Sequence, residues 1–180
     1  LLYVNYFKIN KFNLAKKYID KLLKIENNNY NLFRDKAYVE YLDNNFQESE
    51  IFIEKAIAIK NNEVFGLNIL GLVYIKRKDL MNAISIFNKA VSINPEYSDS
   101  YNNLGRCYIE LEKLNLAYYN FKKAYKLNPS SDLSLINIAN ILSLKDKNNA
   151  ALKLYEKAKN INPNNKQADE NIIICNIRLK

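Results

Sequence analysis

Histidine is absent from this 180-residue chain, and glycine and cysteine are scarce. The absence of histidine excludes Ser–His–Asp and Cys–His catalytic groups and removes the commonest side-chain ligand for metals. Three glycines cannot form a phosphate-binding loop, and neither the G-x-x-x-x-G-K-[ST] motif nor a Cys-x-x-Cys pair occurs. We therefore expect no enzyme, no metal site and no cofactor site within these residues.

Long apolar runs and targeting signals are also missing. No stretch of about 18 apolar residues occurs, so a membrane span is not expected. The chain begins with Leu1 rather than methionine, and no basic segment precedes an apolar run, so a signal peptide is not expected either. We interpret the chain as a fragment of a longer protein and take a cytoplasmic location as the default expectation.

The dominant positive feature is a motif that recurs every 34 residues. Its clearest copy contains, in order, Leu70, Gly71, Tyr74, Ala83, Phe87, Ala90 and Pro95. The next copy contains Leu104, Gly105, Tyr108, Ala117, Phe121, Ala124 and Pro129. The third copy contains Ile138, Ala139, Leu142, Ala151, Tyr155, Ala158 and Pro163. A fixed period of this length is typical of stacked copies of one small unit, each burying its apolar face against its neighbours.

Each copy has the spacing of two amphipathic helices. Apolar residues recur three, four and seven residues apart, which places them on one face of a helix. Small residues at the glycine and alanine positions let the two helices approach closely, and the residue before each proline avoids the helical conformation, so the second helix ends there. The spacing predicts helices over residues 1–10, 12–26, 30–43, 46–60, 64–77, 80–93, 98–111, 114–127, 132–145, 148–161 and 166–179.

The motif resembles the tetratricopeptide repeat, and the resemblance covers the whole chain. It divides the chain into a partial repeat at 1–29, repeats at 30–63, 64–97, 98–131 and 132–165, and a final first helix at 166–180. Repeat 30–63 departs from the pattern, because Leu, Tyr, Ala and Pro are replaced there by Lys36, Glu40, Ser49 and Asn61. The resemblance implies one all-α array, a right-handed solenoid of antiparallel helix pairs. Pentatricopeptide repeats have a similar length but lack this Gly-Tyr-Ala-Pro set.

The resemblance also implies a function and a site. First helices of this family line a concave groove, so we expect a protein–protein interaction scaffold that binds an extended peptide or a partner helix there. In the family, groove residues lie three and two before, and one after, the small Gly or Ala position. Applied to this chain, that rule gives the candidate peptide-binding residues Arg34, Tyr38, Asn68, Leu72, Asn102, Asn103, Arg106, Asn137, Asn140 and Asn171.

Three of these candidates share one repeat position, namely Asn103, Asn137 and Asn171. This column resembles the asparagine ladder of O-GlcNAc transferase repeats. A carboxamide both donates and accepts hydrogen bonds, so it can bind a peptide backbone regardless of the bound side chains. The alternative is a solvated groove in which the column has no such role. The carboxylate clamp of chaperone partners is not expected, because no repeat has its Lys and Asn at the required places.

Other interpretations stay open. The chain could be a non-catalytic, substrate-recruiting module of a larger enzyme, or a structural array that self-associates through the ends of its solenoid. Lysines of the second helices, such as Lys122, Lys123 and Lys126, are expected on the outer face, where they keep the chain soluble. Contact with nucleic acid or a membrane surface is the alternative for them, but the acidic excess of residues 25–112 argues against a nucleic-acid partner.

The two cysteines occupy one repeat position, two repeats apart. Packed helices are separated by roughly 8–10 Å, whereas a disulfide needs its Cα atoms within about 7 Å. We therefore expect Cys107 and Cys175 to be buried, unpaired apolar residues. The identity of the partner is not encoded in any motif of this sequence.

Overall fold

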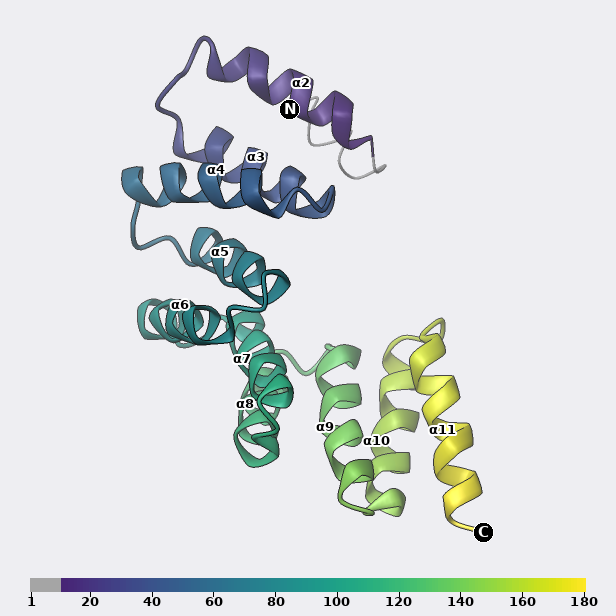
Figure 1. The fold of residues 1–180 in the computed structure, drawn as a ribbon. Helices are drawn as coiled ribbons and strands as arrows, with labels where there is room; N and C mark the ends of the chain where they lie inside the picture. The colour runs from purple at the N-terminus through teal and green to yellow at the C-terminus, as the bar shows by residue number, and fades with distance from the viewer. Residues whose placement is uncertain (1–10) are drawn as a thin grey trace. The chain divides into compact units, whose positions relative to one another are not determined.

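The computed structural model describes residues 11–180, and this part of the chain is built from α-helices without a strand (Figure 1). The predicted helix over residues 1–10 lies outside the described residues. The other predicted helices are confirmed, with small differences at their ends. They are α2 (Phe12–Leu23), α3 (Tyr30–Leu42), α4 (Phe46–Ile59), α5 (Val64–Lys76), α6 (Leu80–Ile93), α7 (Ser98–Glu110), α8 (Leu114–Leu127), α9 (Asp132–Leu144), α10 (Asn148–Ile161) and α11 (Lys166–Arg178).

The chain divides into two compact units, one through Pro95 and one from Glu96 onward. The division falls within two residues of the predicted boundary between repeats 64–97 and 98–131. In the first unit α3 packs on α4 and α5 on α6, and in the second unit α7 packs on α8 and α9 on α10. These contacts confirm the predicted pairing of first and second helices. A single array spanning both units stays a prediction.

The two glycines of the motif, Gly71 and Gly105, lie against aromatic rings of their paired helices. A Cβ atom added to Gly71 would lie 2.5 Å from ring carbons of Phe87, and one added to Gly105 would lie 2.5 Å from a ring carbon of Phe121. Both rings are buried, so the glycines make room for them. The alanines of the motif are fully buried; they are Ala83, Ala90, Ala117, Ala124, Ala151 and Ala158.

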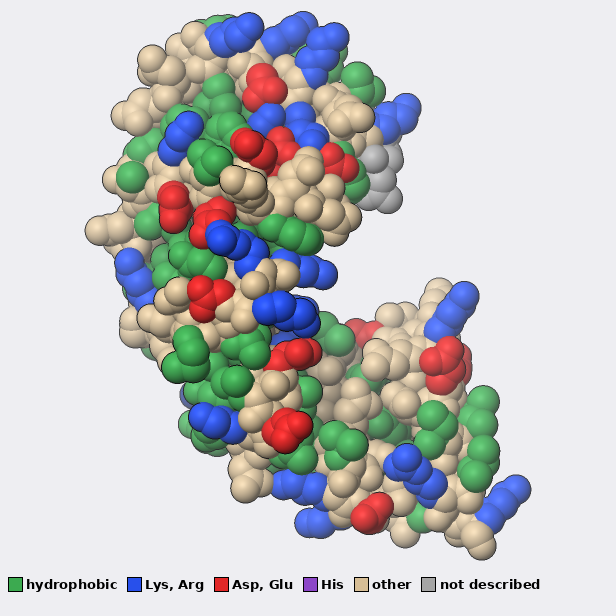
Figure 2. Space-filling model, viewed as in Figure 1, with side chains coloured by type: hydrophobic (Ala, Val, Ile, Leu, Met, Phe, Trp, Pro, Cys, Tyr) green, Lys and Arg blue, Asp and Glu red, His purple; other side chains and the backbone are tan. Residues whose placement is uncertain are grey.

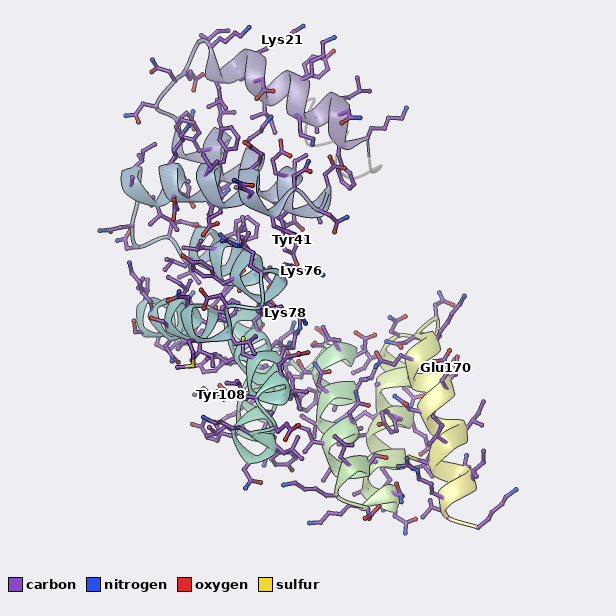
Figure 3. The ribbon with its side chains drawn as sticks, in the orientation of Figure 1. Lys21, Tyr41, Lys76, Lys78, Tyr108 and Glu170 are labelled. Carbon is purple, nitrogen blue, oxygen red and sulfur yellow. The ribbon has the colours of Figure 1, made fainter. Side chains whose placement is uncertain are left out.

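The turn inside each helix pair has a residue with positive φ. These residues recur every 34 positions, and they are Asn44, Lys78, Glu112 and Asp146. After Lys78, labelled in Figure 3, the Asp79 N–H donates to the Tyr74 carbonyl over 2.9 Å. Such a bond satisfies a free carbonyl at the end of a helix and requires a left-handed residue before it. Glycine is the usual residue there, so the absence of glycine hid this turn in the sequence.

Repeat 30–63 replaces two apolar motif residues by a buried ion-pair network. Lys36 and Glu40 are each only 5% exposed. The Lys36 ammonium group donates to Asp20 over 2.8 Å, and that of Lys16 donates to Glu40 over 2.9 Å. Burial lowers the pKa of Lys16, but hydrogen bonds to Asp43 and Glu40 outweigh burial and raise that pKa. Charged contacts therefore join α3 to α2 where a standard motif would supply Leu and Tyr.

Candidate peptide-binding site

The ten predicted site residues all lie on first helices of their repeats. Arg34 and Tyr38 belong to α3, Asn68 and Leu72 to α5, Asn102, Asn103 and Arg106 to α7, Asn137 and Asn140 to α9, and Asn171 to α11. The division of the chain separates them into a group on the first unit and a group on the second. Each group is therefore a separate candidate site.

First helices of the second unit are joined by side-chain hydrogen bonds. The Asn102 carboxamide on α7 donates to the Ser134 hydroxyl on α9 over 2.9 Å. The Asn171 carboxamide on α11 donates to the Asn140 carboxamide oxygen on α9 over 3.2 Å. These bonds place α7, α9 and α11 side by side in one surface. We call this surface, with its six predicted residues, the first-helix face of the second unit.

Polar residues fix where these helices begin. The Ser131 hydroxyl accepts from the Ser134 N–H over 3.2 Å at the start of α9. Asn165 caps α11 and donates its own carboxamide to Asp132 over 2.8 Å, which links the starts of α9 and α11. Burial raises the pKa of Asp132, but hydrogen bonds from Asn165 and Asn162 outweigh burial and lower it. The carboxylate therefore stays ionised and holds the two helix starts together at neutral pH.

Three buried polar atoms of α7 and α9 have no hydrogen-bond partner among residues 11–180. They are the hydroxyl oxygen of Ser100, the carboxamide oxygen of Asn102 and the carboxamide nitrogen of Asn137. Buried polar groups in proteins are nearly always paired, so each exception calls for an explanation. The Asn102 atom is an acceptor and the Asn137 atom is a donor, and these two atoms belong to neighbouring helices. A peptide backbone carries the complementary pair, an N–H donor and a C=O acceptor.

The asparagine column differs from a row of free carboxamides. Asn103 is buried, and its carboxamide oxygen accepts from the Arg106 guanidinium over 3.0 Å. Asn171 is engaged with Asn140, which also accepts from the Tyr155 hydroxyl over 2.7 Å. Burial raises the pKa of Tyr155 to about 12, so this hydroxyl stays a donor at neutral pH. Two of the three asparagines of the column, Asn103 and Asn171, are therefore hydrogen-bonded to neighbouring side chains. The role of the column in binding stays a prediction.

In the first unit, Arg34 lies among aromatic rings and beside a carboxylate. Its guanidinium carbon is 5.5 Å from the ring centroids of both Tyr30 and Phe65, and a guanidinium nitrogen is 2.7 Å from the Asp35 carboxylate. Tyr38 meets Phe65 edge to face at 5.8 Å. The charge of Arg34 is therefore balanced within the unit. The other two predicted residues on this unit, Asn68 and Leu72, are buried and partly buried respectively.

Sequence reasoning missed three residues that contact the predicted ones. Tyr30 precedes Arg34 by four residues, while Phe65 and Ser134 precede Asn68 and Asn137 by three. Each therefore lies one helical turn earlier on the same face. Extending the three repeat positions by one turn would have found all of them. The rule failed because it took only the positions around the small residue.

The second unit has another candidate binding surface, a hollow on its second helix α8. Its volume is about 560 Å³, and its lining consists of Tyr118, Tyr119, Lys122, Lys123, Tyr125 and Lys126. The ammonium group of Lys122 lies 5.7 Å from the ring centroid of Tyr118. The three predicted outer lysines thus combine with tyrosines into an alternative binding surface, which any test of the first-helix face must include.

A metal-holding group and a membrane-spanning helix are both absent from residues 11–180. No group of three or more His, Cys, Asp and Glu side chains in this range is placed to hold a metal ion. Within the same residues, no helix has the length and apolar character that crossing a bilayer requires. Cys107 and Cys175 are both free and buried, as predicted. Burial raises the pKa of the Cys107 thiol to about 11, so it is not a reactive thiolate at neutral pH.

Comparison of the sequence with known families gives one consistent answer. Two sequence models of the tetratricopeptide repeat match the chain, one over residues 86–119 and the other over residues 66–97 and 134–165. The matched ranges lie within repeats 64–97, 98–131 and 132–165, in which the motif is complete or nearly so. No curated protein matches the sequence.

Solved structures share the fold at low sequence identity. A tetratricopeptide repeat protein of Thermus thermophilus, TTC0263, is 17% identical with a TM-score of 0.83, and the match covers 98% of this chain and 96% of that one. PilF of Pseudomonas aeruginosa is 19% identical with a TM-score of 0.84, covering 99% and 87%. YrrB, described as a tetratricopeptide repeat protein with an unusual peptide-binding site, is 20% identical with a TM-score of 0.68, covering 93% and 87%.

These neighbours confirm the all-α solenoid of helix pairs as the fold class. Helix pairing, the buried small residues and the family matches agree with one another. The chain therefore belongs to the tetratricopeptide repeat family, whose fold serves as a scaffold for protein–protein interaction.

Proposed function

We propose that the second unit binds an extended peptide segment of a protein partner on its first-helix face. Asn102 and Asn137 are the centre of this site, and Asn103, Arg106 and Asn140 support it. The proposal makes the chain a binding module without chemistry of its own, because tetratricopeptide repeat proteins are generally non-catalytic scaffolds.

One observation carries the proposal, namely the unpaired acceptor of Asn102 and the unpaired donor of Asn137. On binding, the two carboxamides turn toward the peptide, so that a backbone N–H of the peptide donates to the Asn102 oxygen and a backbone carbonyl accepts from the Asn137 nitrogen. Leaving such buried groups unpaired costs about 1–3 kcal/mol each, so a ligand that pairs them gains affinity. Because the contacts are to backbone, they do not depend on the peptide's side chains.

Arg106 adds a preference for acidic peptides. Its side chain is exposed and stands one helical turn after Asn102 and Asn103 on α7. The bond to Asn103 uses one of the five guanidinium N–H donors, so the others can pair with a carboxylate. An acidic side chain next to the bound backbone is therefore the preferred partner. YrrB is described as having a peptide-binding site, and its shared fold supports the extension of peptide binding to this chain.

The test uses peptides selected by the protein itself. The 180-residue chain is panned against a phage library of random dodecapeptides, and the enriched sequence is synthesised with a fluorescent label. Binding is then measured by anisotropy. Asn102→Ala combined with Asn137→Ala is expected to weaken the peptide at least about tenfold, because both backbone contacts are lost. Circular dichroism is expected to show unchanged helicity.

A matched control separates this loss from a general effect of removing asparagines. Asn149→Ala changes an exposed asparagine on α10, a second helix, and is expected to leave affinity unchanged. The proposal is wrong if the peptide binds the double variant as well as wild type. If affinity is instead lost when Lys122, Lys123 and Lys126 are changed to Ala, the hollow on α8 is the binding surface.

A further inference from the structure

Lysine side chains without a carboxylate partner gather at the hollow on α8. Three of them line the hollow, and they are Lys122, Lys123 and Lys126. The ammonium group of a fourth, Lys157 of α10, lies 5.2 Å from the ring centroid of Tyr125, which also lines the hollow. None of the four forms an ion pair with another residue of the range 11–180. Helix α8 itself contains no Asp or Glu, so this positive charge is uncompensated.

A basic hollow on α2 is arranged differently. Its volume is about 480 Å³, and its lining includes the carboxylate of Asp20. Two of its lysines, Lys16 and Lys36, already donate hydrogen bonds to carboxylates. No aromatic side chain lines it. Unpaired lysines and aromatic rings therefore meet on α8 and not on α2.

Tyrosine rings accompany the lysines of the α8 hollow. Tyr119 is 65% exposed, and Lys122 and Lys126 follow it at spacings of three and four residues, so the three lie on one helix face. Tyr118 and Tyr125 are partly buried against the core of the second unit. Figure 2, in which tyrosine is coloured as hydrophobic, shows basic and hydrophobic side chains together at the left edge of α8. Tyr119 is therefore the ring on which an incoming flat group can stack.

We propose that this hollow binds single-stranded nucleic acid, with one base stacked on Tyr119 and the backbone phosphates paired with the four lysines. Aromatic rings beside a basic groove commonly hold single strands without sequence preference. Lysine only donates hydrogen bonds, and a phosphodiester backbone presents acceptor oxygens to it. A peptide suits this lining less well, because each of its residues brings an N–H donor that lysine cannot pair. A bilayer presents a flat surface, which does not enter a hollow.

The local charge favours this partner although another part of the chain is acidic. Residues 113–165 contain nine Lys and three Asp or Glu, which gives a net charge of +6. The acidic excess lies in residues 25–112, and no carboxylate lines the hollow. The hollow lies on a second helix, whereas the proposed peptide site lies on first helices, so the two proposals are independent.

The test measures binding of the 180-residue chain to a fluorescein-labelled single strand of twelve thymidines by anisotropy. Four lysine–phosphate contacts with a single strand predict a slope of about −2.8 for log K against log salt concentration. Binding is therefore expected to weaken about 20-fold between about 50 and 150 mM salt, from a dissociation constant of roughly 5 µM to one of roughly 100 µM.

Charge removal at the hollow tests the phosphate contacts. Lys122→Gln combined with Lys126→Gln is expected to halve the slope to about −1.4 and to weaken binding at least about tenfold at about 50 mM salt. The matched control is Lys89→Gln combined with Lys166→Gln, which removes two exposed lysines from α6 and α11. Both variants have the same net charge, and the control is expected to bind like wild type.

Substitution of Tyr119 tests the stacked base. Tyr119→Ala is expected to weaken binding about 5- to 100-fold without changing the salt slope, because the ring is lost and the phosphate contacts stay. Tyr119→Phe keeps the ring and is expected to bind like wild type. Circular dichroism is expected to show unchanged helicity in both variants, because this side chain is mostly exposed.

Several results would overturn the proposal. One is a wild type that leaves the strand unbound up to about 500 µM chain at about 50 mM salt, and another is a Tyr119→Ala variant with unchanged affinity. Equally tight binding of poly-L-glutamate would assign the hollow to an acidic segment of a protein, and equally tight binding of phosphatidylserine vesicles would assign it to a membrane surface. Loss of binding on changing Asn102 and Asn137 to Ala would move the strand to the first-helix face.

Discussion

Gly105 gives the most direct test of how tightly the helix pairs are packed. A Cβ atom at this position would lie 2.5, 2.6 and 2.8 Å from three ring carbons of Phe121. Phe121 is 1% exposed and lies against Ala117 on its own helix and Ile138 of α9, so the ring has no free space to move into. Gly105→Ala therefore forces the two helices apart.

The expected magnitude is a balance of two effects. Adding one methyl group to a packed core costs about 1–3 kcal/mol, and the close ring contacts put this site near the upper end. Alanine in a helix is more favourable than glycine by about 1 kcal/mol, which offsets part of the cost. We expect Gly105→Ala to lower the free energy of unfolding by about 1–2 kcal/mol, equivalent to roughly 2–8 °C in melting temperature.

Gly66 provides a matched control in the same protein. Its added Cβ would meet only the Tyr30 hydroxyl at 3.2 Å, a Glu63 carboxylate oxygen at 3.5 Å and an Ile53 methyl group at 3.6 Å. Gly66→Ala is therefore expected to be neutral or slightly stabilising. Urea unfolding followed by circular dichroism measures both variants. Equal stability of Gly105→Ala and Gly66→Ala would refute the argument that the Phe121 contact is tight.

Three further changes test other parts of the structure. Burial raises the pKa of Cys107 from 9.0 to about 11, so the folded state holds the proton more tightly and stability falls as pH rises through that range. Cys107→Val is expected to remove up to about 2 kcal/mol of this fall between pH 9 and 11, and equal pH slopes in urea unfolding would contradict it. Lys78→Gly is expected to stabilise by about 1 kcal/mol, because φ is 64° there, and a lower melting temperature would count against it. Glu40→Gln is expected to destabilise by about 2–3 kcal/mol, because Lys16 and Lys36 lose their shared buried carboxylate, whereas an unchanged urea midpoint would show that the network contributes little.

The helices and their pairing could be predicted from the sequence because they depend on local spacing. Apolar residues three and four apart fix one buried face of each helix, and Gly71 and Gly105 mark where two helices must come close. The prolines predicted the ends of second helices, because the residue before a proline avoids the helical conformation. The cysteines were also predictable, because a shared repeat position two repeats apart excludes a disulfide whatever the details of packing.

The polar interior was not predictable, because pairing depends on side chains that come from other elements. Lys36 and Glu40 look like defects in the motif, and only their contacts with Lys16 and Asp20 of α2 explain their burial. The positive φ residues were hidden for a related reason. Lys78 carries no local preference for a left-handed turn, so the geometry of the helix pair imposes it.

The sequence by itself determined the repeat, the helix pairs and the helices that carry the candidate site, because periodicity fixes which residues share a face. Only the tertiary structure decided which asparagine side chains are hydrogen-bonded to neighbouring side chains. Asn103, Asn137 and Asn171 are equivalent in the sequence, yet Asn103 is bonded to Arg106 and Asn171 to Asn140, while the nitrogen of Asn137 has no partner among residues 11–180. The Asn103–Arg106 bond depends on the side-chain conformations within α7, and the Asn171–Asn140 bond depends on differences of a few tenths of an ångström in the separation of two helices. A repeat pattern specifies neither.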